Sequence, residues 1–277
     1  MMVPLIPFLP DETSLTNHII TKQGRLRCRS HGEFAQWLAA SGGSLAVTTY
    51  TSGKLVLVCS RQGRLCFRTL HLARPMGMAL NNGRFAVAVQ KSILLYRWSA
   101  ARPHEESAMG SFELAEEYQT GKVDCHDLAF TRRGLLFANT RFNCIARAVQ
   151  RRSFVACWRP PFIDQLVGED QCHLNGLGMR NGTPAMVTAF SETNFNKGWR
   201  TANRFETGVL IDVVQNRVVA RGLCMPHSPR YHRRQWWLCN SGLGSLSVFD
   251  PNGGELTEVC RLPGFTRGLC LVNNHAL

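Results

Sequence analysis

The phrase HDLAF at residues 126–130, followed by an Arg-Gly turn at 133–134 and an apolar run at 135–139, recurs in variant forms along this chain. The related phrases are RPMGMAL (74–80), HLNGLGM (173–179), PHSPRY (226–231) and TRGLCLV (266–272). Successive phrases lie about 40 to 50 residues apart, which is the length of one four-stranded propeller blade. The repeat therefore predicts an all-β, β-propeller-like fold of about six blades.

The residues around these phrases fit the same interpretation. Short runs of period two, typical of β-strands, stand at 209–214 and 218–223, and three more at 44–50, 54–59 and 65–70. A short helix is expected around residues 33–40. A β-sandwich would also use many short strands, but it gives no reason for a similar phrase to open each unit.

The two ends of the chain set the expected domain limits. Residues 1–30 are interpreted as an N-terminal extension, and residues 31–277 as a single propeller-like repeat domain. The sequence ends at Leu277, just after the first strand of the expected last blade, so we expect that blade to be incomplete. Unless the beginning of the chain completes it, an open blade edge favours self-association.

Charge and composition narrow the possible partners. Hydrophobic residues make up 44% of the chain, which is typical of a globular protein. The net charge of +13 suggests anionic ligands, but the basic residues come as short pairs rather than in long runs, which argues against nucleic acid. A small-molecule ligand is therefore the expected partner.

The location follows from what the sequence does not contain. No apolar run approaches the roughly 20 residues of a membrane span, and the start MMVPLIPFLPDE lacks the pattern of a signal peptide. The eleven cysteines are scattered singly, without a C-x-x-C pair, so most are interpreted as small buried side chains. We expect a cytoplasmic protein without membrane contact.

Unusually polar residues open or precede the repeated phrases. The first strand of each blade lines the channel of a propeller, so these side chains are expected to converge at the channel mouth. They are His126, Asp127, Glu169, Asp170, His173, Asn175, His227, Ser228, Arg230 and Arg267.

The three histidines from three blades suit a divalent transition metal with open positions. We predict His126, His173 and His227 as its ligands, with metal-free substrate contact and a structural polar network as open alternatives. Nearby carboxylates are the candidate catalytic acids, bases or orienting groups. These are Asp127, Glu169 and Asp170.

Two arginines are candidates for binding an anionic substrate. Arg230 and Arg267 could hold a carboxylate or phosphate, or could instead form salt bridges with Glu169 or Asp170. Asn175 and Ser228 are further candidate substrate contacts. Trp199 and Arg200 complete this set, because they lie in a long insertion at 191–205 that could cover the channel as a lid.

Taken together, the phrases resemble a bacterial family of conserved hypothetical proteins, described as a domain of unknown function with a propeller-like repeat. The resemblance covers about residue 34 to residue 277 and rests on HDLAF, EDQCHLNGLGM (169–179), GLCMPHSPR (222–230) and LPGFTRGL (262–269). It implies the fold and the candidate residues, but no reaction. The chain departs from the family at Gln171, where the family carries Arg, and at Thr207-Gly208, where it carries two glycines.

The sequence therefore predicts an enzyme that acts on a small, anionic molecule at a histidine-lined channel mouth, with a metal ion as one version of the site. The alternative is a non-catalytic propeller that binds a ligand or a protein through the same polar residues.

Overall fold

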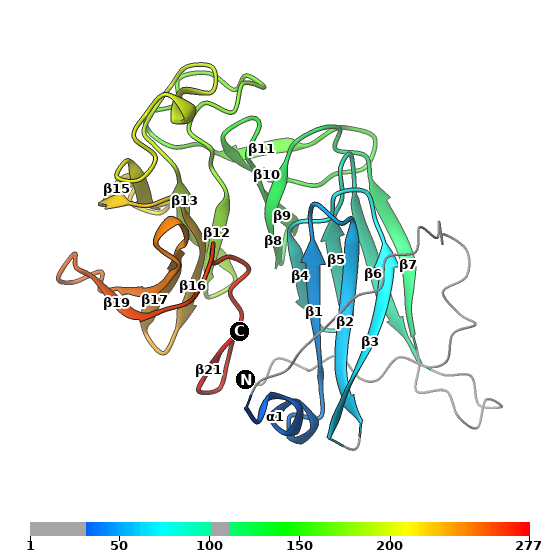
Figure 1. Cartoon of the computed structure of the whole chain (residues 1–277). Helices are drawn as coiled ribbons and strands as arrows, with labels where there is room; N and C mark the ends of the chain where they lie inside the picture. Colours follow the sequence, from blue (N-terminus) through cyan, green and yellow to red (C-terminus); the bar gives the residue numbers. More distant parts are fainter. Residues whose placement is uncertain (1–31, 62, 101–110) are drawn as a thin grey trace. The chain divides into compact units, whose positions relative to one another are not determined.

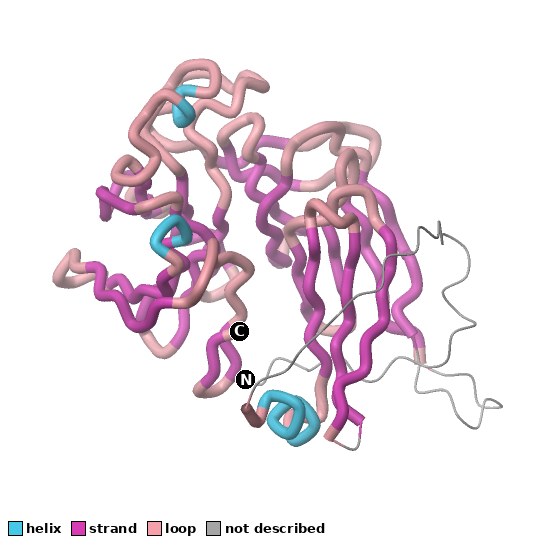
Figure 2. The backbone as a smooth tube through the Cα atoms, in the orientation of Figure 1, coloured by secondary structure: helices cyan, strands magenta, loops and turns pink. Residues whose placement is uncertain are grey.

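The computed structural model describes residues 32–61, 63–100 and 111–277. This part of the chain divides into two compact units. The first runs through Gln90 and includes Leu94–Glu117, and the second consists of Lys91–Ile93 and Tyr118–Leu277. Each unit consists mainly of antiparallel β-sheet (Figures 1 and 2).

The first unit carries one helix and two sheets. The helix is α1 (Phe34–Ala40), whose Leu38 packs on β2, where the sequence predicted a helix. The first sheet has the order β1 (Ser44–Thr49), β2 (Lys54–Arg61) and β3 (Arg64–His71). The second has the order β4 (Met78–Asn81), β5 (Arg84–Ala88), β6 (Ile93–Ser99) and β7 (Ser111–Tyr118).

The second unit carries three four-stranded sheets and a hairpin. The sheets are β8 (Cys125–Thr131), β9 (Gly134–Asn139), β10 (Cys144–Arg147), β11 (Val155–Trp158); β12 (Gly176–Arg180), β13 (Thr183–Ala189), β14 (Gly208–Asp212), β15 (Arg217–Leu223); and β16 (Pro226–His232), β17 (Gln235–Asn240), β18 (Ser245–Phe249), β19 (Leu256–Arg261). The hairpin is β20 (Leu271–Val272) and β21 (His275–Ala276). Two 3-10 turns, η2 (Gly198–Arg200) and η3 (Ser241–Leu243), lie in connections (Figure 2).

Strands follow one another across each of these sheets, which is the topology of a propeller blade. Within the second unit, β12 contacts both β8 and β16, so the first strands of three successive sheets lie side by side (Figure 1). Gly178 permits this approach, because a Cβ there would lie 2.6 Å from the Trp236 ring and 2.9 Å from the Pro229 carbonyl oxygen. This is the close backbone approach that glycine allows in crowded strands.

Apolar layers hold neighbouring sheets of the second unit together. Ala138 of β9 and Leu177 of β12 belong to one buried cluster, and Leu210 of β14 and Leu238 of β17 belong to the next. A smaller cluster joins Cys239 to Leu269, just before the terminal hairpin. Because each sheet has a neighbour on a face, its period-two pattern is blurred into nearly continuous apolar runs.

The all-β, propeller-like prediction is confirmed, but the number of blades is corrected. Five blades occur in the described ranges, rather than about six. The unit expected after β19 is only the short β20–β21 hairpin, whose strands have two residues each. The predicted extension at residues 1–30 lies outside the described residues. No helix in the described part of the chain is long and apolar enough to cross a membrane.

Candidate functional site

The three predicted histidines come together in the second unit. The ring of His126 lies 5.1 Å from that of His173 and 6.2 Å from that of His227, measured between centroids. His126 and His227 are each the second residue of an inner strand, β8 and β16. His173 differs, because it lies in the connection before β12.

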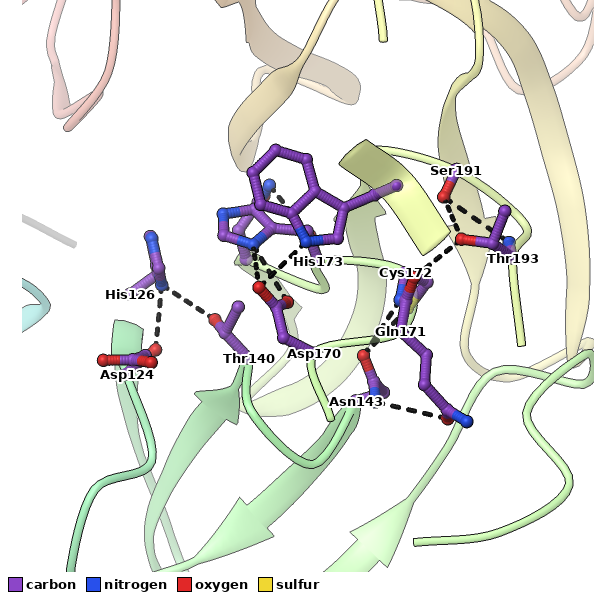
Figure 3. A network of polar contacts seen from close by, with 12 residues as sticks. Asp124, His126, Thr140, Asn143, Asp170, Gln171, Cys172, His173, Ser191 and Thr193 are labelled. Atoms are coloured by element: carbon purple, nitrogen blue, oxygen red, sulfur yellow. Dashed lines mark hydrogen bonds and ion pairs between the residues drawn. The ribbon is translucent and has the colours of Figure 1, made fainter. Parts of the chain in front are cut away.

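His126 is fixed through its Nδ1 atom. Nδ1 lies 2.8 Å from the backbone oxygen of Asp124 and 2.7 Å from Oγ1 of Thr140 (Figure 3). A carbonyl oxygen only accepts hydrogen bonds, so Nδ1 is the protonated nitrogen and Nε2 of the neutral ring carries a lone pair. Asp124 has a φ of 50°, a left-handed conformation that short polar residues tolerate.

His227 repeats this arrangement in the strand that opens a later sheet. Its Nδ1 lies 3.1 Å from the backbone oxygen of Met225 and 2.9 Å from Oγ of Ser241. The carbonyl again belongs to the residue two positions before the histidine, and that residue again has a positive φ, 48°. The lone pair of this ring is therefore also on Nε2.

His173 is held by a carboxylate and by aromatic rings. Nδ1 donates to Asp170, with distances of 3.0 Å and 3.1 Å to the two carboxylate oxygens (Figure 3). The indole nitrogen of Trp199 donates to the same carboxylate at 2.9 Å. The rings of Trp199 and Phe190 each lie 4.4 Å from the imidazole. The insertion at 191–205 thus contacts the site through Trp199.

The second ring nitrogen, Nε2, of each of the three histidines differs from Nδ1 in its contacts. Within the described residues, none of the three has a hydrogen-bond partner, and in Figure 3 Nε2 of His173 lies on the side of its ring that faces His126. His227 is only 4% exposed, so little of this residue is open to solvent. Three acceptors from separate segments therefore come together without a donor from the described part of the chain.

The electrostatics of the site keep two of these rings neutral. Burial lowers the pKa of His126 well below its ordinary value, and nearby His173 and Arg267 lower it further. Burial likewise lowers the pKa of His227, followed by the effects of Arg267 and the two other histidines. At neutral pH both rings are bases without a proton on Nε2.

Arg267 brings positive charge to the same place. Its pKa is lowered, mainly by burial, although more than a third of the residue is exposed, so the guanidinium stays charged. The backbone N–H of the next residue, Gly268, donates to Oγ of Ser228 at 3.0 Å, which ties this loop to β16. Phe265 of the same loop is 47% exposed and lies 5.5 Å from the ring of His227.

Asp127 and Arg230 form an ion pair with each other, with two hydrogen bonds between the guanidinium and the carboxylate. The guanidinium nitrogens lie 2.8 Å and 3.0 Å from the two carboxylate oxygens, which also accept the backbone N–H groups of Leu128 and Leu177. Burial lowers the pKa of Arg230, but Asp127 outweighs it and the pKa is raised. The expected salt-bridge partners of Arg230, Glu169 or Asp170, are not the ones found.

The other candidates are placed less centrally. Asn175 is buried, accepts a hydrogen bond from Thr188 Oγ1 at 2.7 Å and donates to the His173 carbonyl oxygen at 3.2 Å. Arg200 is exposed and covers the Trp199 ring at 4.4 Å. For Glu169, only backbone hydrogen bonds occur in the described residues, to Val167 and Lys197.

Sequence reasoning missed the residues that hold the histidines. Thr140 and Ser241 each follow an asparagine at the end of a second strand, and each stands 14 positions after the histidine that it contacts. This Asn-Thr and Asn-Ser recurrence at fixed spacing was a signal that could have identified them.

The predicted metal site is not ready-made in the described residues. No group of three or more histidine, cysteine, aspartate or glutamate side chains there is arranged so that it could hold a metal ion.

Comparison with known proteins identifies a family. The model of the family described as Domain of unknown function (DUF4915) matches residues 32–277. No curated protein matches the chain.

Several solved structures are similar to this chain at low sequence identity. Sqt1 of Saccharomyces cerevisiae is 11% identical, with a TM-score of 0.48, 84% of this chain and 76% of that chain covered. A Thermus thermophilus protein described as a putative oxidoreductase (glucose dehydrogenase) is 12% identical, with a TM-score of 0.46 and coverage of 82% and 84%. Kuenenia stuttgartiensis hydrazine synthase is 11% identical, with a TM-score of 0.44 and coverage of 82% and 67%. At these scores the likenesses carry no argument about function.

Proposed function

We propose that this chain, which belongs to the family described as Domain of unknown function (DUF4915), is an enzyme that acts on a small anionic molecule at the site of His126, His173 and His227. One observation carries the proposal. All three imidazoles are fixed through Nδ1, and within the described residues no protein group contacts the three Nε2 lone pairs by a hydrogen bond. Bases held in one tautomer are what proton transfer requires.

The three histidines have different parts in this proposal. His173 is the general base, because the Asp170 carboxylate on its Nδ1–H stabilises the imidazolium that forms when Nε2 takes a proton. Asp170 is the positioning residue, and the indole N–H of Trp199 donates to the same carboxylate. His126 and His227 stay neutral at pH 7 and accept hydrogen bonds from the substrate.

The charge of the site supports an anionic substrate. Arg267 lies close enough to His126 and His227 to lower the pKa of both rings, and it is exposed, so a substrate can reach it. A guanidinium binds carboxylate and phosphate groups with two parallel hydrogen bonds. Arg230 is not available for this role, because Asp127 already binds its guanidinium in that way.

A library of small carboxylates and phosphates tests the proposal. We expect at least one of them to raise the unfolding temperature of the wild-type protein and to be consumed by it, as measured by mass spectrometry. His173→Asn should retain folding and abolish consumption. His232→Asn, which changes a histidine at the far end of β16, is the matched control and should behave as wild type. Consumption at an unchanged rate by His173→Asn would remove this site from the reaction.

A metal-dependent version of the same site is the second candidate. It is favoured by one feature, since metal-binding histidines usually donate their other ring N–H to a carboxylate or a backbone carbonyl, as these three do. Elemental analysis of protein purified without a histidine tag decides it. About one equivalent of a divalent transition metal, lost in each single His→Ala variant, would support this version, and metal-free active protein would exclude it.

A further inference from the structure

We propose that the substrate of this site is a hydroxylated anion, a small molecule whose carboxylate or phosphate binds Arg267 and whose hydroxyl groups donate to the histidine Nε2 atoms. This inference rests on the proposed function and names its substrate class. It follows from counting donors and acceptors around the three rings.

The first step is the state of the three nitrogens. Because each Nδ1 donates to an oxygen of the protein, each neutral ring offers only an acceptor at Nε2. A bare carboxylate or phosphate dianion also offers only acceptors, so its oxygens would be repelled by these lone pairs. An anion alone therefore satisfies Arg267 but leaves the histidines unpaired.

The second step is the cost of leaving the acceptors unpaired. His227 is 4% exposed, and a ligand that covers its Nε2 without donating a hydrogen bond would leave this acceptor unsatisfied, which is unfavourable. In the described residues no side chain or backbone N–H donates to its Nε2. A ligand that brings its own donors removes this deficit, and among common small metabolite groups the hydroxyl is a neutral donor that does not cancel the negative charge.

The third step is the position of the charge. Arg267 lies in the loop in which the Phe265 ring is 5.5 Å from that of His227 and the Gly268 N–H donates to Ser228 Oγ. Its positive charge also lowers the pKa of His126 and of His227. A small molecule that carries both an anionic group and a hydroxyl group can contact the guanidinium and a histidine ring at once. His173, with Asp170 behind it, then faces a hydroxyl whose proton it can accept.

Matched ligand pairs distinguish binding of the anionic group by Arg267 from binding of the hydroxyl group by the histidines. Glycolate against acetate, lactate against propionate, and glycerol phosphate against methyl phosphate differ by the hydroxyl groups and keep the charge. Titration calorimetry should show that the hydroxylated member of at least one pair binds wild-type protein about ten-fold more tightly, the effect of one or two added hydrogen bonds.

Two variants should affect these two contributions separately. His126→Phe removes one acceptor but keeps an aromatic ring, and should reduce the preference for the hydroxylated member toward equality. Arg267→Gln removes the guanidinium and should weaken both members by a similar factor while keeping the preference. If His126→Phe fails to fold, His173→Phe replaces it, because His173 lies outside the strands. His232→Phe is the control at the far end of β16, where His232 is half-buried and contacts the backbone oxygen of Asn273 instead of the site.

The outcomes are distinct. Equal binding of both members of every pair, or a preference that survives both His→Phe variants, would overturn the hydroxyl inference and leave the anion site intact. A preference that appears only with added divalent metal and disappears with chelator would also overturn it, since the metal would then occupy the lone pairs. If no anion binds wild-type protein at millimolar concentration, the proposed function itself fails.

Discussion

Two aspartates of the second unit lie close in sequence to a histidine of the site but have different partners. Asp127 faces Arg230, and its two oxygens accept four hydrogen bonds from that guanidinium and from backbone N–H groups. Asp170 faces His173 and Trp199. The Asp127–Arg230 pair cannot transfer a proton to or from a ligand, because the guanidinium does not titrate. The Asp170–His173 pair can take part in chemistry, because the second ring nitrogen, Nε2, lets the carboxylate influence a bound ligand.

The largest expected effect is the loss of stability in Asp127→Asn, and the contrast between the two aspartates would fail without it. Asp127→Asn leaves the Arg230 guanidinium without its counter-charge between β8, β12 and the segment that carries Leu269, to whose carbonyl it also donates. We expect the free energy of unfolding to fall by about 3 kcal/mol, as when one partner of a buried ion pair is removed. Urea titration followed by circular dichroism measures it.

The control for this variant is the exposed ion pair of Arg221 and Glu192, at 2.6 Å. Glu192→Gln should change the free energy of unfolding by less than about 0.5 kcal/mol. Asp170→Asn should lie between the two variants. An Asp127→Asn protein as stable as wild type would mean that the Asp127–Arg230 pair is not structural, and Asp127 would return as a catalytic candidate.

The next effect concerns activity rather than stability. Asp170→Asn keeps a hydrogen-bond acceptor for His173 but removes the negative charge, so the imidazolium formed at the base loses its stabilisation. We expect the turnover of the substrate found in the ligand screen to fall by about 100-fold, with a shift in its pH profile. A purely structural aspartate would change unfolding without moving that profile, and such a result would end the distinction between the two aspartates.

The sequence was sufficient for some of this arrangement and insufficient for the rest. Strand positions followed from period-two runs, and the polar openings of β8 and β16 identified His126 and His227. The pairing of Asp127 with Arg230 joins residues 103 positions apart, and no local pattern encodes it. The blade number was overestimated because the TRGLCLV phrase forms only the first part of a hairpin, the two-residue strand β20.

His173 shows a second reason for the limit. The sequence spacing suggested that it opens a strand as the other two histidines do, yet β12 begins only at Gly176. Its position is set instead by Asp170 and by Trp199 from the 191–205 insertion, which are contacts between loops. Loop geometry of this kind depends on tertiary packing and not on hydrophobic periodicity.

A smaller effect is expected of pH on the free energy of unfolding. It comes from the two neutral rings, His126 and His227. The folded-state pKa of His126 and His227 lies below the unfolded value of about 6.5. Above that pH neither state is protonated at these rings, whereas below it the unfolded state takes up protons that the folded state refuses. The free energy of unfolding should therefore fall with falling pH, by at most about 1.4 kcal/mol per pH unit for each ring.

Urea titrations at pH values of about 7.5, 6.5 and 5.5, which bracket the unfolded pKa, measure this slope in metal-free protein. The double variant His126→Asn with His227→Asn should have a flatter pH dependence than wild type, and His232→Asn should match wild type. A slope that stays the same in the double variant would show that other groups cause the acid sensitivity.

The smallest effect tests whether the two blades hold their histidines by the same means. Thr140→Val and Ser241→Ala each remove a hydroxyl from Nδ1 of His126 or His227, while the backbone carbonyls of Asp124 and Met225 remain as acceptors. Because one neutral hydrogen bond is lost and Nδ1 stays paired, each variant should lower the free energy of unfolding by about 1 kcal/mol or less. The two values should agree within about 0.5 kcal/mol, and Thr257→Val on the exposed face of β19 should have no effect. A large loss at only one of the two sites would show that the repeated geometry conceals unequal roles, with that hydroxyl supporting more than the orientation of its ring.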